Sequence, residues 1–322
     1  MPETPAPPPP VLAVLTTGGT IASTRDEHGV STPSLGAADL VAGAAPGARV
    51  RAVEVLRADS SSLTLADAAR VRAAVAGALA DADVAAVVVL HGTDSMEETA
   101  LLLDLHHDDE RPVVLTGAQR TADDPEPDGP ANVAHAARTA LDPAARGRGV
   151  LVAFGGRVHP AVGLSKRHTT DLDAFSSPAA PLPRAEPLPW TDAPWPRVDV
   201  VAVSPGGDGA LVDAALAAGA RGVVLQALGA GNASADVVDA VRRCTRAGVA
   251  VVVTTRVPGG PVSAGYGGGG GGHDLAAAGA VSSGWLRSGQ ARVLLASLLR
   301  TGADADEVRE RFGRRSGGAF PH

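Results

Sequence analysis

Short apolar runs alternate with longer helical patterns along most of the chain, and this alternation limits the possible folds more than any other feature. Strands are predicted at 11–15, 49–56, 84–90, 112–116, 149–154, 198–203, 221–228 and 249–255. Helices are predicted at 64–80, 99–105, 129–141, 210–219, 234–248, 289–300 and 304–312. Helices between successive strands form right-handed crossovers, so we expect an α/β fold with mostly parallel sheets buried on both faces.

A proline-rich stretch divides this pattern into two halves. Residues 177–198 are crowded with proline and carry two of the three tryptophans, which is typical of a linker or of an extended arm on the surface. The predicted organisation is a disordered leader at 1–10, a first domain at 11–180, a linker at 181–198 and a second domain at 199–322.

Composition excludes several classes of function. The net charge is −7, there is no basic stripe and aromatic residues make up only 2% of the chain, so nucleic-acid binding is disfavoured. No run of about 18 apolar residues predicts a membrane span. The N-terminus lacks the features of a signal peptide, and the single cysteine, Cys244, cannot form an internal disulfide. We therefore expect a cytoplasmic protein.

Polar motifs follow the first-domain strands where each strand ends. They are TTGGT (16–20), ADSSS (58–62), HGTD (91–94) and GAQR (117–120). Ligands of open α/β sheets bind beyond the carboxyl ends of the strands, so these motifs are expected to share one edge. The side chains that could do chemistry there are Thr17, Ser60, Ser61, Thr93 and Asp94.

Each motif also has a purely structural interpretation. Ser95 with Glu98 matches a capping box at the start of a helix. TTGGT could be a phosphate-binding turn, but it lacks the lysine of a P-loop and the spacing of a dinucleotide fingerprint. The serines of ADSSS could form only a polar turn, and Lys166 in SKRHTTD (165–171) could be a solvated charge.

Other routes to chemistry are weaker. HHDDE (106–110) has metal-ligand residue types but is predicted to end a helix and enter a surface turn, so we expect no metal and no cofactor. His91 precedes a glycine and is expected to pack or bond locally rather than act as a base. The sequence contains no GxSxG, HExxH or CxxC motif.

A threonine-based site is what remains. A threonine hydroxyl is a poor nucleophile unless a base or a cation lies nearby. A desolvated lysine amine can lose its proton and serve as that base, and Asp94 beside Thr93 could hold it in place.

Two motifs together resemble the bacterial-type L-asparaginase family: TGGTIA (17–22) and HGTDSMEETA (91–100). The similarity continues through LTGAQR (115–120), DGPANV (128–133), SKRHTTDLDAFSSP (165–178), GAGN (229–232) and ARVLLASLL (291–299). The resemblance implies a larger N-terminal α/β domain with a mostly parallel sheet and a smaller flavodoxin-like C-terminal domain. It also implies hydrolysis of L-asparagine to L-aspartate and ammonia without metal or cofactor, with side activity on glutamine left open.

The resemblance assigns a role to each candidate residue. Thr17 matches the nucleophile that forms an acyl-enzyme, and Thr93, Lys166 and Asp94 match a second triad that relays protons and positions water. Asp94 should also bind the substrate ammonium. The remaining contacts should come from Ser60 at the α-carboxylate, Ser61 beside it, the backbone N–H of Thr93 at the oxyanion, the Ala118 carbonyl at the leaving amide, and Asn232 presented by a neighbouring subunit.

This chain departs from the family pattern at two places. Val30 stands where the family has a lid tyrosine bonded to the nucleophile, so Ser31 and Thr32 are guesses for its replacement. A glycine run, 267–272, occupies the region of the partner-subunit glutamate. The run, next to the only tyrosine, Tyr266, either rebuilds part of the site or is a floppy surface loop.

Two alternatives to an asparaginase stay open at this point. One is the asparaginase-like subunit of a tRNA-dependent amidotransferase, although the short leader leaves no room for that subunit's extra domain. The other is a non-catalytic amino-acid-binding relative. For the asparaginase, the resemblance implies a homodimer or homotetramer as the only partner besides the substrate.

Overall fold

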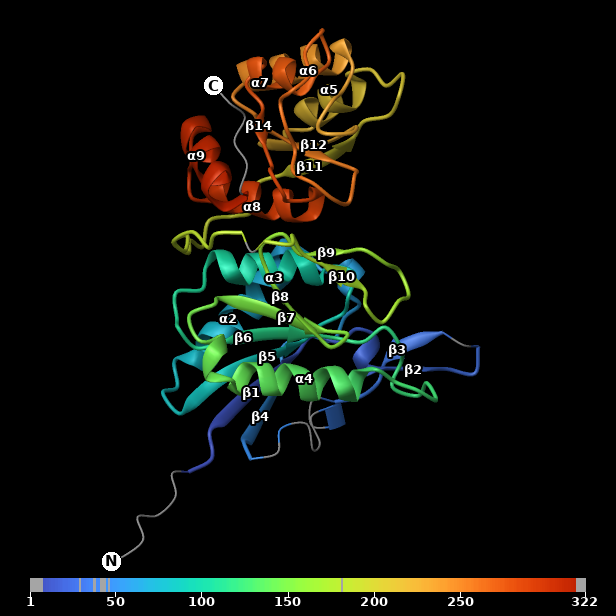
Figure 1. The fold of residues 1–322 in the computed structure, drawn as a ribbon, viewed down its shortest axis with the longest axis vertical. Coiled ribbons are helices and arrows are strands. Elements are labelled where there is room, and N and C mark those ends of the chain that lie inside the picture. Colours follow the sequence, from blue (N-terminus) through green and yellow to red (C-terminus); the bar gives the residue numbers. More distant parts are fainter. Residues whose placement is uncertain are drawn as a thin grey trace, which may run out of the picture. The chain divides into compact units, whose positions relative to one another are not determined.

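A computed structural model describes residues 8–28, 30–36, 39–40, 45, 47–180 and 182–316. The chain forms two compact units, each described here by itself (Figure 1). The first contains the described residues up to Ala100, His107–Pro160 and His168–Phe175. The second contains Leu101–His106, Ala161–Arg167 and the residues from Ser176 onward.

A six-stranded sheet forms the centre of the first unit. Its strands are β1 (Val11–Thr16), β4 (Arg49–Glu54), β5 (Val84–Leu90), β6 (Val113–Thr116), β7 (Val150–Phe154) and β8 (Arg157–Pro160). The order is β4-β1-β5-β6-β7-β8, and every pair is parallel except β7–β8. The mostly parallel sheet confirms the predicted α/β class, whereas β8 was not predicted.

Helices cover both faces of this sheet, which explains why its inner strands, β1, β5, β6 and β7, are apolar runs. Helix α4 (Gly129–Leu141) packs on β5, β6 and β7, and α2 (Leu65–Leu79) packs on β5 and β1 (Figure 1). Val88 and Leu90 belong to the core cluster under α4, so the alternating residues of β5 face the opposite side. Thr64, the first residue of the helix predicted at 64–80, caps α2 in a capping box with Asp67.

The second unit is built on a four-stranded parallel sheet in chain order. Its strands are β11 (Val198–Ala202), β12 (Gly222–Ala227), β13 (Ala250–Thr255) and β14 (Val281–Ser282). Its helices are α5 (Ala210–Ala217), α6 (Ala235–Arg246), α7 (Gly272–Ala277), α8 (Ser288–Arg300) and α9 (Ala305–Ser316). Cys244 is fully buried in α6 and packs in the core.

The smaller elements sit in the connections. They are η1 (Thr20–Ala22), β2 (Ser23–Arg25), β3 (Ser31–Pro33), η2 (Ser60–Ser62), η3 (Pro143–Ala145), β9 (Ser165–Lys166) and β10 (Phe175–Ser176). Helix α3 (Met96–Leu105) crosses the boundary between the two units, because the boundary falls after Ala100.

The proline-rich segment is anchored at several points along its length. The backbone N–H of Leu188 donates to the Leu105 carbonyl, and Arg184 pairs with Asp104 at 3.0 Å. The guanidinium of Arg300 lies 4.5 Å from the ring centroid of Trp190 and 4.2 Å from that of Trp195. These contacts fit an extended arm better than a free linker.

The exact domain limits stay a prediction. Most of the expected disordered leader lies outside the described residues.

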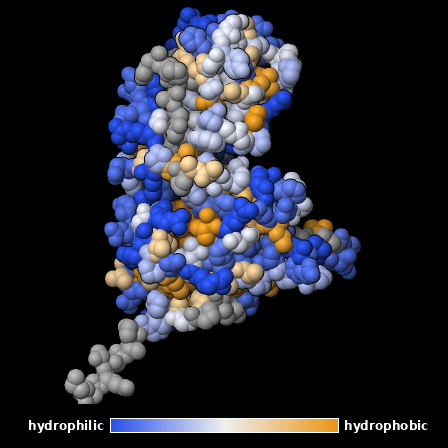
Figure 2. Space-filling view, viewed as in Figure 1, coloured by the Kyte–Doolittle hydropathy of each residue, from blue (hydrophilic) through white to orange (hydrophobic). Residues whose placement is uncertain are grey.

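Within the described ranges, no helix has the length and apolarity needed to cross a bilayer. On the face drawn in Figure 2, hydrophobic residues occur in scattered groups between hydrophilic ones.

Candidate active site

Thr17 lies directly after β1 and is held against the end of β5. Its backbone N–H and its hydroxyl both donate to the Leu90 carbonyl, at 3.0 and 3.2 Å. Only 1% of the residue is exposed. A carbonyl oxygen can orient this hydroxyl but cannot take its proton, so activation of Thr17 as a nucleophile requires another group.

Two glycines let neighbouring loops approach Thr17 closely. Gly19 has φ 81°, and a Cβ on it would lie 2.5 Å from the Cα of Gly92. Gly18 has φ 97°, and a Cβ there would lie 2.6 Å from the Ala58 carbonyl oxygen. Only glycine combines these positive φ values with such contacts. TTGGT is therefore packed directly against HGTD and ADSSS.

Ser60 and Asp94 meet at the same edge. The hydroxyl oxygen of Ser60 accepts the Asp94 backbone N–H at 3.1 Å, and the Ser60 carbonyl accepts the Ser95 hydroxyl at 2.6 Å. Ser60 is buried, and its hydroxyl hydrogen is left to donate to an anion. The Asp94 side chain is exposed just before α3, and Ser61 is exposed beside Ser60. The Ser95 hydroxyl thus joins two loops.

Thr93 contacts a residue that sequence reasoning did not single out. Its hydroxyl, in a residue that is 5% exposed, donates to Oε1 of Gln119 at 3.3 Å. The Nε2 of Gln119 donates to the carbonyls of Thr169 and Asp171. Gln119 lies inside the GAQR motif, directly after β6. That position at the end of a strand could have marked it as a candidate site residue.

The segment around Ala118 is framed by two polar side chains from DGPANV. The Asp128 carboxylate accepts the backbone N–H of Gln119 and of Arg120, at 2.9 to 3.1 Å. Asn132 donates to the Gly117 carbonyl at 3.0 Å. Ala118 itself is buried, and this frame fixes its peptide group. A carboxylate just before a helix and an amide within its first turns were the sequence signal for this frame.

His91 is fully buried and serves the local backbone. Its Nδ1 lies 2.7 Å from the Gly92 carbonyl oxygen. Burial lowers the pKa of His91 to about 4, so the ring is neutral near neutral pH. This environment agrees with the packing interpretation of His91.

Lys166 and Asn232 belong to the second unit, so their place beside Thr17 and Thr93 stays a prediction. Lys166 is half-buried in β9. It is also the only lysine in the sequence. The Oδ1 of Asn232 accepts the backbone N–H of Gly272 at 3.2 Å.

The glycine run is held in place by several hydrogen bonds. The Asp274 carboxylate accepts the N–H groups of Gly269 and Gly271, at 2.8 and 2.9 Å. The Gly270 carbonyl accepts the Ala233 N–H at 2.7 Å. The run is therefore fixed to its neighbours rather than floppy, and a contribution of it to the site stays a prediction. The Tyr266 side chain at its start is 64% exposed.

The segment expected to act as a lid is the β2–β3 hairpin. Asp26 closes its turn by accepting the N–H groups of His28 and Val30, each at 2.9 Å. Val30 is 55% exposed, Thr32 is exposed on β3, and the side chain of Ser31 is outside the described part. The replacement of the lid tyrosine by Ser31 or Thr32 stays a prediction.

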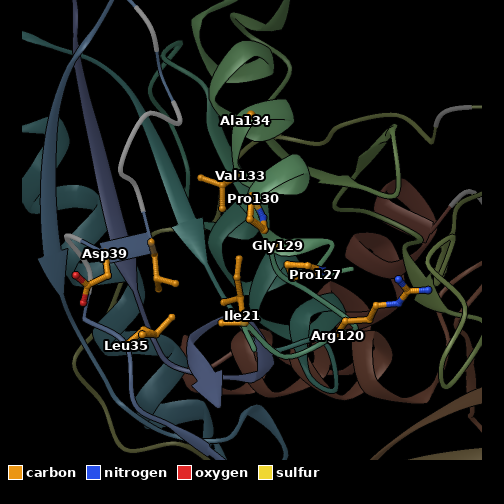
Figure 3. Close-up of a pocket in the computed structure, with 11 residues that line it drawn as sticks. Ile21, Leu35, Asp39, Arg120, Pro127, Gly129, Pro130, Val133 and Ala134 are labelled. Carbon is orange, nitrogen blue, oxygen red and sulfur yellow. The ribbon is translucent and has the colours of Figure 1, made fainter. Parts of the chain in front are cut away.

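Two other features take no substrate role. His107 bonds to the Arg111 carbonyl and Asp109 pairs with Arg111, and within the described ranges no cluster could hold a metal. A cavity of about 330 Å³ lies next to Ile21 in the first unit (Figure 3). Its lining is mostly apolar, and Arg120 extends away from the other lining residues, so it does not suit an amino-acid substrate.

Two family models match the chain: "Asparaginase, N-terminal" at residues 11–186 and "Glutaminase/Asparaginase C-terminal domain" at residues 197–312. A probable L-asparaginase of Deinococcus radiodurans is 37% identical over 245 residues, which cover 70% of this chain and 74% of that protein. An L-asparaginase of Bacillus licheniformis is 31% identical over 309 residues, covering 89% and 95%. The crystal structure of a probable cytoplasmic L-asparaginase from Campylobacter jejuni matches with a TM-score of 0.82 at 28% identity, covering 94% and 99%.

Proposed function

The chain belongs to the asparaginase family, and from that membership we propose that it is an L-asparaginase, an amidohydrolase that converts L-asparagine to L-aspartate and ammonia. The observation that carries the proposal is the meeting of TTGGT, ADSSS and HGTD beyond the carboxyl ends of β1, β4 and β5. Agreement with L-asparaginases over most of the chain favours hydrolysis over an amidotransferase subunit or a binding protein.

In the proposed reaction, the Thr17 hydroxyl attacks the amide carbon of asparagine. The oxyanion is stabilised by the Thr93 backbone N–H. The proton of the Thr17 hydroxyl passes to the amide nitrogen, the C–N bond breaks to release ammonia, and an acyl-enzyme ester remains on Thr17. Burial of Thr17 supports this role, because interactions with a developing charge are stronger where water is excluded.

Thr93, Lys166 and Asp94 then activate the water that hydrolyses the ester. Lys166 supplies the amine that moves protons, since an arginine guanidinium cannot be deprotonated in a protein. Asp94 also binds the substrate ammonium, for which its exposed carboxylate is suited.

The other substrate contacts follow the geometry at the sheet edge. The Ser60 hydroxyl binds the α-carboxylate, because its hydrogen is left to donate to an anion. Ser61 lies beside it, and the framed carbonyl of Ala118 accepts the leaving amide N–H. Glutamine is one methylene longer, which typically gives only about 10- to 200-fold discrimination, so slower glutamine hydrolysis is expected.

Ammonia release from L-asparagine tests the proposal. Wild type should be active, and Thr17→Ala and Thr93→Ala should each lower kcat by more than about 10³-fold while circular dichroism stays unchanged. Thr191→Ala, in the proline-rich segment, is the matched control and should be fully active. A wild-type protein that binds asparagine without releasing ammonia would instead be a binding relative.

We further propose a homodimer or homotetramer in which Asn232 of one subunit completes the site of another, and a cytoplasmic location. The name of the Campylobacter jejuni protein supports the location. Analytical ultracentrifugation and cell fractionation test these two points, and a fully active monomer would exclude the shared site.

A further inference from the structure

Gln119 links the two motifs that carry the second half of the proposed chemistry. Its Oε1 accepts the Thr93 hydroxyl, in a long hydrogen bond of 3.3 Å. Its Nε2 donates to the Thr169 carbonyl at 3.3 Å and to the Asp171 carbonyl at 3.1 Å. Both carbonyls lie in the exposed segment just after Lys166.

The direction of the amide follows from its partners. Carbonyl oxygens only accept hydrogen bonds, so the NH₂ group of Gln119 must face Thr169 and Asp171. The reversed amide would place Oε1 against two carbonyl oxygens. Oε1 therefore faces Thr93 and can only accept, which makes the Thr93 hydroxyl the donor and turns its lone pairs away from Gln119.

Both sides of this contact are held by further hydrogen bonds. The Asp128 carboxylate accepts the backbone N–H of Gln119 at 3.0 and 3.1 Å. On the other side, Nδ1 of His168 accepts the N–H groups of Thr170 and Asp171, at 3.2 and 2.8 Å. The carboxamide thus spans two segments that are each ordered independently.

We propose that Gln119 is a positioning residue for asparagine hydrolysis, which fixes the direction of the Thr93 hydroxyl and ties it to the segment after Lys166. The inference rests on the proposed function, because Thr93 must act on protons for its hydroxyl direction to matter. With its hydrogen held by Gln119, Thr93 presents lone pairs to its other neighbours. Without Gln119, the hydroxyl would lose the acceptor that sets the direction of its hydrogen.

The first test replaces the carboxamide with an apolar group of similar length. Gln119→Met should lower kcat for L-asparagine by about 10- to 100-fold, because the misoriented hydroxyl remains present but is seldom productive. KM should change by less than about threefold, since Thr93 keeps its backbone. Arg120→Met is the matched control. It removes a neighbouring side chain that pairs with Glu126, and its kcat and Tm should equal those of wild type.

Gln119→Glu separates positioning from packing. A neutral carboxyl can accept from Thr93 and donate to one carbonyl, whereas an ionised one faces carbonyl oxygens and is disfavoured. The ratio of its kcat to that of wild type should therefore rise as pH falls, and the same ratio for Gln119→Met should stay flat. A structural role alone predicts no such difference.

Wild-type ammonia release is measured first, so that a failure of the proposed function can be distinguished from a failure of the positioning role of Gln119. An inactive wild type overturns the proposed function. An active wild type with Gln119→Met within about twofold of its kcat overturns only the positioning role. An equal loss in Arg120→Met, or a pH-independent ratio for Gln119→Glu, overturns it as well.

Discussion

Lys166 is the only lysine among the 28 lysine and arginine residues of this chain. Proton transfer requires a group that can lose a proton. The amine of lysine can do so, whereas the guanidinium of arginine stays protonated in proteins. The isolated lysine therefore supports the proton-transfer role proposed for it. This signal was present in the sequence and does not depend on any motif.

Lys166→Arg tests that role while the positive charge is kept. We expect kcat to fall by at least about 100-fold, the typical scale of general acid–base catalysis, with the fold intact by circular dichroism. Arg167→Lys, the adjacent swap in the opposite direction, should leave kcat unchanged. Retention of wild-type kcat in Lys166→Arg would show that only charge is needed.

His91 should make stability depend on pH. Its pKa is about 4 in the folded protein, against 6.5 for an unperturbed histidine, so the unfolded chain binds the proton more readily. The stabilisation is present above about pH 6.5 and is lost as pH falls toward 4, by up to about 3 kcal/mol. Urea denaturation between these values checks this, and His91→Asn should flatten that part of the profile.

The candidate residues on the sheet edge were predictable because parallel strands end together. The role of Gln119 was not, since it depends on side-chain directions in three separate loops. The hydrogen bond from Thr17 to Leu90 likewise depends on the register between β1 and β5.

At the level of elements, long amphipathic or apolar segments were predicted well and short ones were missed. Helix α4 begins and ends where its pattern does, and Thr64 caps α2. Strand β8 was missed, although Gly155 and Gly156 both have positive φ and form the two-residue turn to it. Two adjacent glycines between strands predict a hairpin turn, but this pair did not stand out in a chain with so many glycines.

The pinned glycine run predicts different outcomes for two chemically identical substitutions. A Cβ on Gly271 would collide with the Tyr266 carbonyl, whereas a Cβ on Gly267 meets nothing within 4 Å. Gly271→Ala should cost about 1 to 3 kcal/mol in urea denaturation, and Gly267→Ala should be neutral. Equal effects would mean that the run is loose in solution.

For the whole molecule, alternating strands and helices predicted an α/β fold with mostly parallel sheets, which the structure confirms. The alternation could not show that α3 would cross the boundary between compact units, because units are defined by contacts distant in sequence. Nor could it show how the proline-rich segment is anchored, since that depends on Arg300 in α8 meeting two tryptophans.

Arg300→Met should loosen the proline-rich segment without unfolding the protein. Loss of the guanidinium that lies over the rings of Trp190 and Trp195 should cost about 1 to 2 kcal/mol and reduce the near-UV circular dichroism of the tryptophans. Arg246→Met, an exposed residue at the end of α6, is the control. An unchanged near-UV spectrum in Arg300→Met would contradict the anchoring role.

The run at 267–272 consists of six identical glycines, so the sequence of the run does not itself say which glycine takes which place in the loop. The four glycines that precede His273 have set partners, because Asp274, Ala233 and Asn232 each bind one or two of them. The place of each partnered glycine is therefore set by its distance along the chain from Asp274. Gain or loss of one glycine would therefore be absorbed at Gly267 and Gly268, where an added Cβ meets nothing within 4 Å, and the partnered end would keep its register.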